Sequence, residues 1–277
     1  MSCQHETPLQ TAPPVNQPLL ESLAWLQEEL SAIKSDNLFR PVRVRSGRQS
    51  NTVTLNGLSL INFGANDYLG YAGDPRLIKA SAKGACAEGA GAGASPLVSG
   101  HSSLHDILGK SLSSLLGTED SLIFPSGYAA NTATISCLAG PGDLIVSDAH
   151  NHASIIDGCR LSKADVRLYP HRNVIAAAEL LQTIPARRRL IVTDSLFSMD
   201  GTIAPLTGLA QLAQDTQSML LVDEAHATGL FGTHGSGLIE AAGIASSVAV
   251  RVGTLSKALG SAGGFVSGHH ELIEFLR

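Results

Sequence analysis

Four apolar residues run directly into two acidic ones in the stretch Met219-Leu220-Leu221-Val222-Asp223-Glu224-Ala225-His226. A short apolar run without polar alternation is typical of a strand that is buried on both faces of a parallel sheet. Open α/β sheets bind their ligands at the carboxyl ends of such strands. We therefore expect Asp223 and His226 to face a binding crevice.

A glycine-bounded loop of small residues carries a lysine in Gly253-Thr254-Leu255-Ser256-Lys257-Ala258-Leu259-Gly260. The small neighbours leave room around the lysine amine for a bulky partner. A strand expected over residues 248–252, lying beside the strand that ends at Asp223, would bring Lys257 to the same crevice. A cofactor aldehyde would fit there, since a lysine amine forms a Schiff base with a carbonyl group.

Together, these two stretches resemble the pyridoxal-phosphate core of the α-oxoamine synthases, which condense an amino acid with an acyl thioester and release carbon dioxide. The resemblance implies an α/β chain of pyridoxal-phosphate-dependent transferase fold type I, with a mostly parallel central sheet flanked by helices. It implies that pyridoxal 5'-phosphate is held by Lys257, that Asp223 bonds the pyridinium nitrogen and that His226 contacts the phenolic oxygen. Lys257 would also remove the α-proton of the amino acid.

A glycine turn before a helix expected over residues 129–138 suits a phosphate, because a helix N-terminus offers free N–H groups and a positive dipole end. Gly127 and Tyr128 stand on this turn, where the family has its phosphate-contacting pair. By the same resemblance Thr254 donates to the phosphate. The phosphate is thus expected between this turn and the Lys257 loop.

Two further segments match the family. His152, in Asn151-His152-Ala153-Ser154, stands where the family's histidine stacks on the pyridine ring, and a helix-capping histidine is the alternative. Ser198, in Phe197-Ser198-Met199-Asp200-Gly201, stands where a serine bonds the phenolic oxygen, although sequence alone would favour an ordinary loop hydroxyl. Both residues are expected in the cofactor site.

Asn66 lies in Asn66-Asp67-Tyr68-Leu69-Gly70, which matches a family signature whose asparagine lies close to the substrate carboxylate. A simple turn is an equally good interpretation of this asparagine. Arg40 or Arg43 is a candidate contact for the thioester carrier, although plain surface charge is the simpler account. Asn66 and Arg40 are the expected substrate contacts.

The segments at 157–164 and 263–267 resemble members that join L-alanine to pimeloyl-CoA or pimeloyl-acyl-carrier protein, an early step of biotin synthesis. Glycine with acetyl-CoA is the alternative pair of substrates. The family also implies a homodimer, in which the loop Gly89–Ser95 passes near the partner's cofactor. The same segment does not fit a dinucleotide-binding loop, because it follows a helix pattern and not a strand.

Three regions are expected: a mobile proline-rich tail over residues 1–18, a helix and small β ribbon over 19–62, and a large cofactor-binding domain over 63–277. The helix is expected over 19–34, and the ribbon from the alternating residues 42–45 and the hairpin at Asn56-Gly57. Family members continue into a small C-terminal domain. We therefore expect the 277 residues alone to bind cofactor weakly and to turn over poorly.

Composition excludes several classes of function. The chain has 19 Lys and Arg against 24 Asp and Glu, a net charge of -5, and no basic stripe for nucleic acid. It shows no apolar run long enough to span a bilayer, no signal-peptide pattern and no paired cysteines, which favours the cytoplasm. A soluble enzyme of small molecules is expected.

Two motifs suggest other classes of function. Asp223-Glu224-Ala225-His226 also resembles the Walker B motif of DEAH-type ATPases, but Gly109-Lys110-Ser111 has no glycine at the position a phosphate loop requires. The His150-x-His152 pair lacks a third ligand at helical spacing, so no metal site is predicted. A noncatalytic binding relative of the fold remains an alternative.

Overall fold

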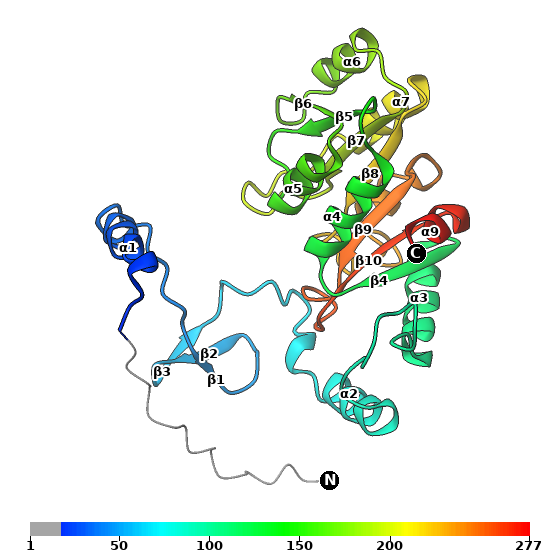
Figure 1. Cartoon of the computed structure of the whole chain (residues 1–277). Helices are drawn as coiled ribbons and strands as arrows, with labels where there is room; N and C mark the ends of the chain where they lie inside the picture. The colour runs from blue at the N-terminus through cyan, green and yellow to red at the C-terminus, as the bar shows by residue number, and fades with distance from the viewer. Residues whose placement is uncertain (1–17) are drawn as a thin grey trace. The chain divides into compact units, whose positions relative to one another are not determined.

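The computed structural model describes residues 18–277, which contacts divide into two units, Met1–Arg45 and Ser46–Arg277. The tail expected over residues 1–18 lies outside the described residues except for its last one. In the first unit, the expected helix is present but is split into a 3-10 turn, η1 (Glu21–Leu23), and helix α1 (Trp25–Ser35). The units are described separately below (Figure 1).

A β hairpin lies near the start of the second unit, with β2 (Thr52–Leu55) antiparallel to β3 (Leu58–Ile61). Asn56 and Gly57 both have positive φ, 51° and 80°, which suits the turn that a two-residue hairpin favours. The predicted hairpin is therefore confirmed. Strand β1 is only Arg45–Ser46, so the prediction of a strand from residue 42 was wrong; alternation over four residues is a weak signal when neither face is buried.

A seven-stranded sheet forms the centre of the second unit, in the order β4-β10-β9-β8-β7-β5-β6 (Figure 1). Strands β6, β5, β7, β8 and β9 are mutually parallel, whereas β10 is antiparallel to both β9 and β4. The mostly parallel sheet expected from the sequence is thus observed. The strands are β4 (Asp120–Phe124), β5 (Leu144–Asp148), β6 (Asp165–Tyr169), β7 (Arg189–Asp194), β8 (Met219–Asp223), β9 (Val250–Thr254) and β10 (Gly264–Gly268).

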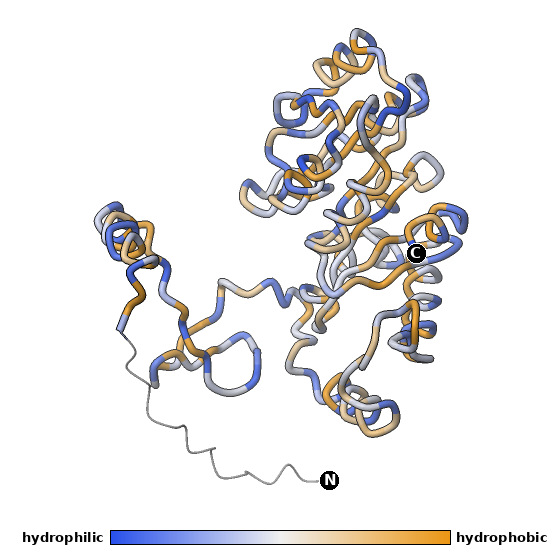
Figure 2. The backbone as a smooth tube through the Cα atoms, in the orientation of Figure 1, coloured by the Kyte–Doolittle hydropathy of each residue, from blue (hydrophilic) through white to orange (hydrophobic). Residues whose placement is uncertain are grey.

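Both faces of this sheet are buried, because successive residues of a strand enter different cores. In β8, Leu221 packs into one core while Leu220 and Val222 pack into the other. Much of these strands is coloured hydrophobic in Figure 2. Helices α4 (Gly127–Leu138), α5 (Ala153–Ser162) and α9 (His270–Leu276) supply the first core, and α6 (Val174–Thr183), α7 (Leu206–Asp215) and α8 (Leu238–Ala241) the second.

The remaining elements of this unit are α2 (Pro75–Glu88), α3 (Ser103–Leu116) and the 3-10 turns η2 (Tyr71–Gly73) and η3 (Ala245–Ser247). Asp74 caps α2 by accepting from the backbone of Arg76, and proline stands at the first helical position, where its missing N–H costs nothing. Among the helices of residues 18–277, none is both long enough and apolar enough to cross a membrane.

Strand register brings polar residues together at one edge of the sheet. Asp194, the last residue of β7, is the direct partner of Asp223, the last residue of β8. Strand β9 runs parallel beside β8 and ends at Thr254, three residues before Lys257. The predicted return of Lys257 from a neighbouring strand is confirmed by this pairing.

Candidate functional site

A cavity of about 210 Å³ lies at the carboxyl ends of β7, β8 and β9. It is also bordered by the N-terminus of α4 and by the loop before α5. This is the edge at which parallel sheets bind ligands. The lining residues are Ser126, Gly127, Tyr128, His152, Ser154, Asp194, Ser198, Asp223, Ala225, His226, Thr254, Ser256 and Lys257.

Asp223 is nearly buried, with 5% of its surface exposed, and both of its oxygens are held. The backbone N–H of Ala225 donates to Oδ1 at 2.8 Å, and Nδ2 of Asn131 donates to Oδ2 at 2.6 Å. A carboxylate fixed in this way is a directed acceptor for a cationic N–H group. Asp223 therefore has the chemistry required to bond a protonated ring nitrogen.

Lys257 lines the same cavity as Asp223, and its Nζ lies 2.7 Å from Nε2 of His226. Burial lowers the pKa of Lys257, while the negative charges of Asp223 and Asp194 act in the opposite direction. A lysine with a lowered pKa has more free amine at neutral pH and is a better nucleophile. The loop thus presents an amine that is suited to attack a carbonyl carbon.

His226 is neutral at physiological pH in this site. Burial and, to a smaller extent, the positive charges of Lys257 and His152 lower its pKa to about 4. Its other nitrogen, Nδ1, lies 2.7 Å from the hydroxyl of Tyr68. His226 therefore joins Lys257 to a tyrosine that the sequence analysis did not select.

The N-terminus of α4 forms the end of the cavity that suits an anion. The Ser126 hydroxyl caps the helix by accepting from the N–H of Ala129 at 3.1 Å. A Cβ at Gly127 would lie 3.3 Å from Cβ of Thr254, so glycine allows the turn and the Thr254 loop to approach closely. Hydroxyl groups and free helix N–H groups converge here, as a phosphate requires.

Tyr128 lines this end as predicted, but its hydroxyl points to another residue. It donates to Oδ2 of Asp157 at 2.7 Å, a bond that raises the pKa of Tyr128. Thr254 donates to the backbone oxygen of Gly263 at 2.9 Å and lies 2.8 Å from Oγ of Ser256. These bonds fix the Thr254 loop beside the helix N-terminus.

His152 is the N-cap of α5 and also lines the cavity. Its Nδ1 accepts from the N–H of Ser154 at 3.2 Å and lies 2.7 Å from the Ser154 hydroxyl. The two interpretations of this residue are therefore compatible: capping fixes the ring, and the fixed ring borders the cavity. Asn131 donates to the same Ser154 hydroxyl at 2.9 Å, so one network runs from His152 to Asp223.

Asp194, which was not predicted from the sequence, also lines the cavity, with 6% of its surface exposed. Burial raises its pKa well above the ordinary value, and the charge of Asp223 adds to this effect. The backbone N–H of His152 donates to its Oδ2 at 2.8 Å. The rule that selected Asp223, an acid directly after an apolar strand, applies equally to Asp194.

The remaining candidates differ in position. Ser198 lines the cavity from the loop after β7. Asn66 does not line it directly, but its Oδ1 accepts from the Tyr68 hydroxyl at 3.2 Å. Arg40 belongs to the first unit, which is described by itself, so its assignment to the substrate stays a prediction.

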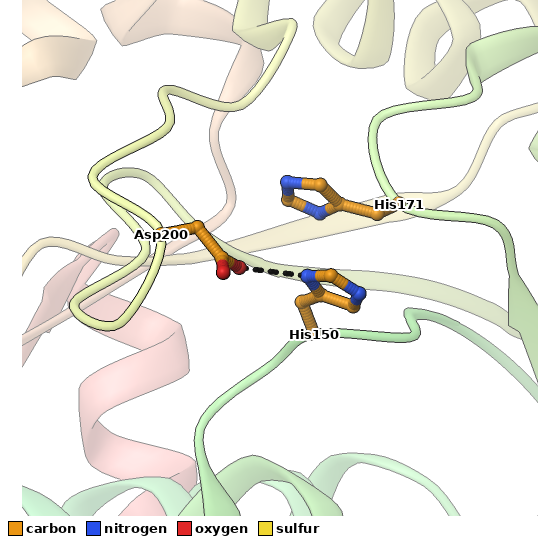
Figure 3. Close-up of side chains that lie close together, drawn as sticks. All are labelled: His150, His171 and Asp200. Atoms are coloured by element: carbon orange, nitrogen blue, oxygen red, sulfur yellow. Dashed lines mark hydrogen bonds and ion pairs between the residues drawn. The ribbon is translucent and has the colours of Figure 1, made fainter.

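The two histidines of the His150-x-His152 pair have different partners. His150 lies 2.8 Å from Oδ2 of Asp200, and its ring stacks on that of His171 with centroids 4.2 Å apart and planes at 8° (Figure 3). The ligand atoms of His150, His171 and Asp200 lie within 4.8 Å of one another, a grouping that the H-x-H spacing does not predict. Parallel rings point their lone pairs in similar directions, whereas tetrahedral coordination needs them to converge.

Comparisons with known proteins agree with this geometry. A family model, aminotransferase class I and II, matches residues 59–277. The 8-amino-7-oxononanoate synthase of Anaeromyxobacter sp. (strain Fw109-5) is 48% identical over 254 residues, covering 92% of this chain and 64% of that protein.

Two solved structures are also similar. The serine palmitoyltransferase of Sphingomonas wittichii has a TM-score of 0.86 and 36% identity, over 94% of this chain and 66% of that one. A structure titled as SPT with PLP has a TM-score of 0.86 and 33% identity over the same shares. The chain thus spans slightly less than two thirds of the length of these relatives.

Proposed function

Since the chain belongs to the aminotransferase class I and II family, and within it to the α-oxoamine synthases, we propose that it binds pyridoxal 5'-phosphate and condenses an amino acid with an acyl thioester. The fold is pyridoxal-phosphate-dependent transferase fold type I. The observation that carries the proposal is that Lys257 and Asp223 line one cavity beside the N-terminus of α4. A noncatalytic relative would have no need of a half-buried lysine with a lowered pKa that faces Asp223 across one cavity.

The residues present fit this cofactor. The N-terminus of α4 would hold the phosphate, together with the hydroxyl of Thr254 once its hydrogen turns from Gly263, and Asp223 would accept from the ring nitrogen. Nζ of Lys257 would hold the aldehyde carbon, with the His152 ring against the cofactor ring and His226 and Ser198 near its phenolic oxygen. When bound, pyridoxal phosphate supplies an electron sink for the charge that develops on the amino-acid α-carbon.

The chain's own residues would then position and deprotonate the amino acid. A free Lys257 amine, beside the neutral ring of His226, is the group that would take the α-proton. Asn66, linked to the site through Tyr68, is proposed to contact the amino-acid carboxylate, and Arg40 the thioester carrier. Burial of Asp223 and Asp194 excludes water from the base of the cavity, which strengthens these polar interactions.

We propose L-alanine and pimeloyl-CoA or pimeloyl-acyl-carrier protein as the substrates, with 8-amino-7-oxononanoate as the product. The relative of that name, at 48% identity, supports this choice. Glycine with acetyl-CoA is the alternative pair from the same family. The similarity to serine palmitoyltransferase makes serine with a long-chain acyl thioester a third candidate.

A cytoplasmic homodimer is part of the proposal. Leu97 and Val98, which follow the glycine-rich segment Gly89–Ser95 after one proline, expose 84% and 80% of their surfaces. Exposed apolar side chains of this size are typical of a surface that a partner covers. A second copy of the chain would bury them.

The test is spectroscopic. The chain is mixed with pyridoxal phosphate, and a new visible absorption band is expected that Lys257→Ala abolishes. Lys110→Ala, an exposed lysine on α3, is the matched control and should leave the band intact. A band that survives Lys257→Ala would overturn the proposal.

Substrate choice is tested by titration of the same band. Alanine, glycine and serine are added separately, and a response to alanine at the lowest concentration is expected. A response to glycine or serine alone would transfer the assignment to the corresponding alternative. ATP hydrolysis by a colourless protein would favour the ATPase interpretation of Asp223-Glu224-Ala225-His226.

A further inference from the structure

Four side chains form a continuous hydrogen-bonded series that ends at the cavity. The Tyr68 hydroxyl lies 3.2 Å from Oδ1 of Asn66 and 2.7 Å from Nδ1 of His226. On the far side of the ring, Nε2 of His226 lies 2.7 Å from Nζ of Lys257. The series joins the segment around residue 66 to the lysine of the proposed cofactor site.

The available hydrogens decide the direction of each bond. A tyrosine hydroxyl has one hydrogen, and Oδ1 of Asn66 can only accept, so Tyr68 donates to Asn66. Both contacts of the hydroxyl are hydrogen bonds only if its oxygen accepts from Nδ1 of His226. Burial is the main cause that lowers the pKa of His226 to about 4, so the neutral ring has only one N–H, and in this arrangement that hydrogen is on Nδ1.

Nε2 of His226 is consequently a bare acceptor, and the bond to Lys257 must be donated by the lysine. Burial also raises the pKa of Tyr68, which keeps its hydrogen in place at neutral pH. With the opposite tautomer, Nε2–H would donate to the lysine and occupy the lone pair of its amine. The two tautomers therefore leave Lys257 in chemically different states.

We propose that Tyr68 is a positioning residue that holds His226 with its hydrogen on Nδ1, so that Lys257 donates to Nε2 and, once it is the uncharged amine, keeps its lone pair free. The inference deepens the proposed function, because its importance rests on Lys257 being the amine that holds the cofactor and takes the α-proton. Asn66 takes part by accepting the Tyr68 hydrogen. An amine with a free lone pair can attack an aldehyde or accept a proton without first breaking a hydrogen bond.

The direct test is nitrogen NMR of the ligand-free protein labelled with ¹⁵N-histidine. His226→Gln identifies the signals of His226 by their loss. The wild type is expected to show a protonated Nδ1 and a bare Nε2 at neutral pH. A protonated Nε2 in the wild type would overturn the inference, whatever the fate of the cofactor proposal.

Tyr68→Phe provides the second measurement, because it removes only the hydroxyl. Nδ1 then lacks its acceptor, and the hydrogen is expected to move to Nε2 in a larger share of the molecules. Tyr71→Phe is the matched control, a part-buried tyrosine three residues away, and should leave the His226 signals unchanged. An unchanged tautomer in folded Tyr68→Phe would also contradict the inference.

These results can be separated from those of the proposed function. Tautomers are observed without cofactor or substrate, whereas the proposed function depends on the visible band and on Lys257→Ala. If both hold, Tyr68→Phe should capture pyridoxal phosphate more slowly than the wild type and Tyr71→Phe. Equal rates of capture with a shifted tautomer would contradict the stated importance of the lone pair.

Discussion

Nδ2 of Asn131, on the first turns of α4, lies 2.6 Å from Oδ2 of Asp223 at the end of β8. The partner is a neutral amide, so the bond orients the carboxylate without cancelling its charge. The same amide nitrogen donates to the hydroxyl of Ser154, which lies 2.7 Å from the His152 ring. One side chain therefore fixes two groups proposed to contact the cofactor ring.

Replacement of Asn131 by leucine should weaken both stability and cofactor binding. The nearly isosteric side chain leaves Oδ2 of Asp223 buried without this donor, a loss of about 1–3 kcal/mol in the free energy of unfolding. Chemical denaturation measures the stability, and the visible band measures binding. Thr134→Val is the control, one turn further along α4: the Thr134 hydroxyl is buried with no partner, so its removal should be neutral or stabilising. Equal losses of stability and cofactor binding in Asn131→Leu and Thr134→Val would show that the bond from Asn131 to Asp223 supports neither.

Gly264 allows β10 to pass directly behind the turn at the start of α4. A Cβ at Gly264 would lie 2.4 Å from the backbone carbon of Ser126 and 2.5 Å from the nitrogen of Gly127. Gly264→Ala should therefore displace the proposed phosphate-binding turn and cost about 1–3 kcal/mol of unfolding free energy. Gly64→Ala, where a Cβ would meet nothing within 4 Å, is the control.

Affinity distinguishes displacement of the turn from general destabilisation. Gly264→Ala should lower the affinity for pyridoxal phosphate even at temperatures where the variant is fully folded. Wild-type affinity in folded Gly264→Ala would mean that the turn does not hold the phosphate.

Local pattern was sufficient to predict the strand ends of the site but not the partners that hold them. Met219–Val222 predicts a buried strand, and the acid after it falls at the ligand-binding edge; the same rule reaches Asp194. Asn131 and Tyr68 could not be found in this way, because their bonds to Asp223 and His226 join residues 92 and 158 positions apart. Such bonds depend on how elements pack, which a local pattern does not contain.

The strand expected from residue 42 was wrong for a physical reason. Residues 42–44 alternate in polarity, yet Val42 exposes 93% and Val44 exposes 72% of its surface. The apolar side chains of this segment therefore do not lie on a buried face. The spacing of His150 and His152 predicted no metal site, but it could not show that the two rings have separate partners. His152 caps α5, whereas His150 contacts Asp200 and His171.

Asp143 should stabilise the protein strongly near neutral pH. It exposes 1% of its surface and accepts from Arg187 at 2.9 and 3.0 Å and from Arg188 at 3.1 Å. The Arg187 bonds, with those from Gly140 and Arg188, outweigh burial and hold the pKa of Asp143 well below its ordinary value. The unfolding free energy of Asp143→Asn should therefore be roughly 2–3 kcal/mol lower than that of the wild type at pH 7.

The pH dependence checks the cause of that loss. A lowered pKa in the folded state gives stability that is present above the ordinary pKa and is lost as the pH falls below it. The difference in unfolding free energy between the wild type and Asp143→Asn should therefore become smaller as the pH is lowered, which denaturation measured at a series of acidic pH values would show. Asp165→Asn, whose exposed carboxylate pairs with Arg167 at 2.9 Å, should stay within about 1 kcal/mol of the wild type throughout. If the difference in unfolding free energy between the wild type and Asp143→Asn does not depend on pH, the charge of Asp143 is not its cause.

Glu224 should act in the opposite direction, making the fold less stable as the pH rises. It exposes 2% of its surface, and burial raises its pKa to about 7, although the N–H groups of Ile239 and Leu238 donate to it. Between its ordinary pKa and about 7 the folded state binds more protons than the unfolded state, so the unfolding free energy falls with rising pH. The expected decrease is about 3 kcal/mol from pH 4.5 to 8, measured by denaturation.

Glu224→Gln should remove this decrease, because glutamine keeps an acceptor for the two N–H groups but does not ionise. Glu240→Gln is the matched control: burial alone would raise the pKa of Glu240, but bonds from His234 and the N–H of Ser236 lower it to about 2. Glu240 is therefore already ionised in the folded and unfolded states over most of the range from pH 4.5 to 8. Its replacement should change the unfolding free energy by a similar amount at each pH and leave the slope against pH unchanged. A slope that survives Glu224→Gln would point instead to Asp194, whose pKa is raised by burial and by the charge of Asp223.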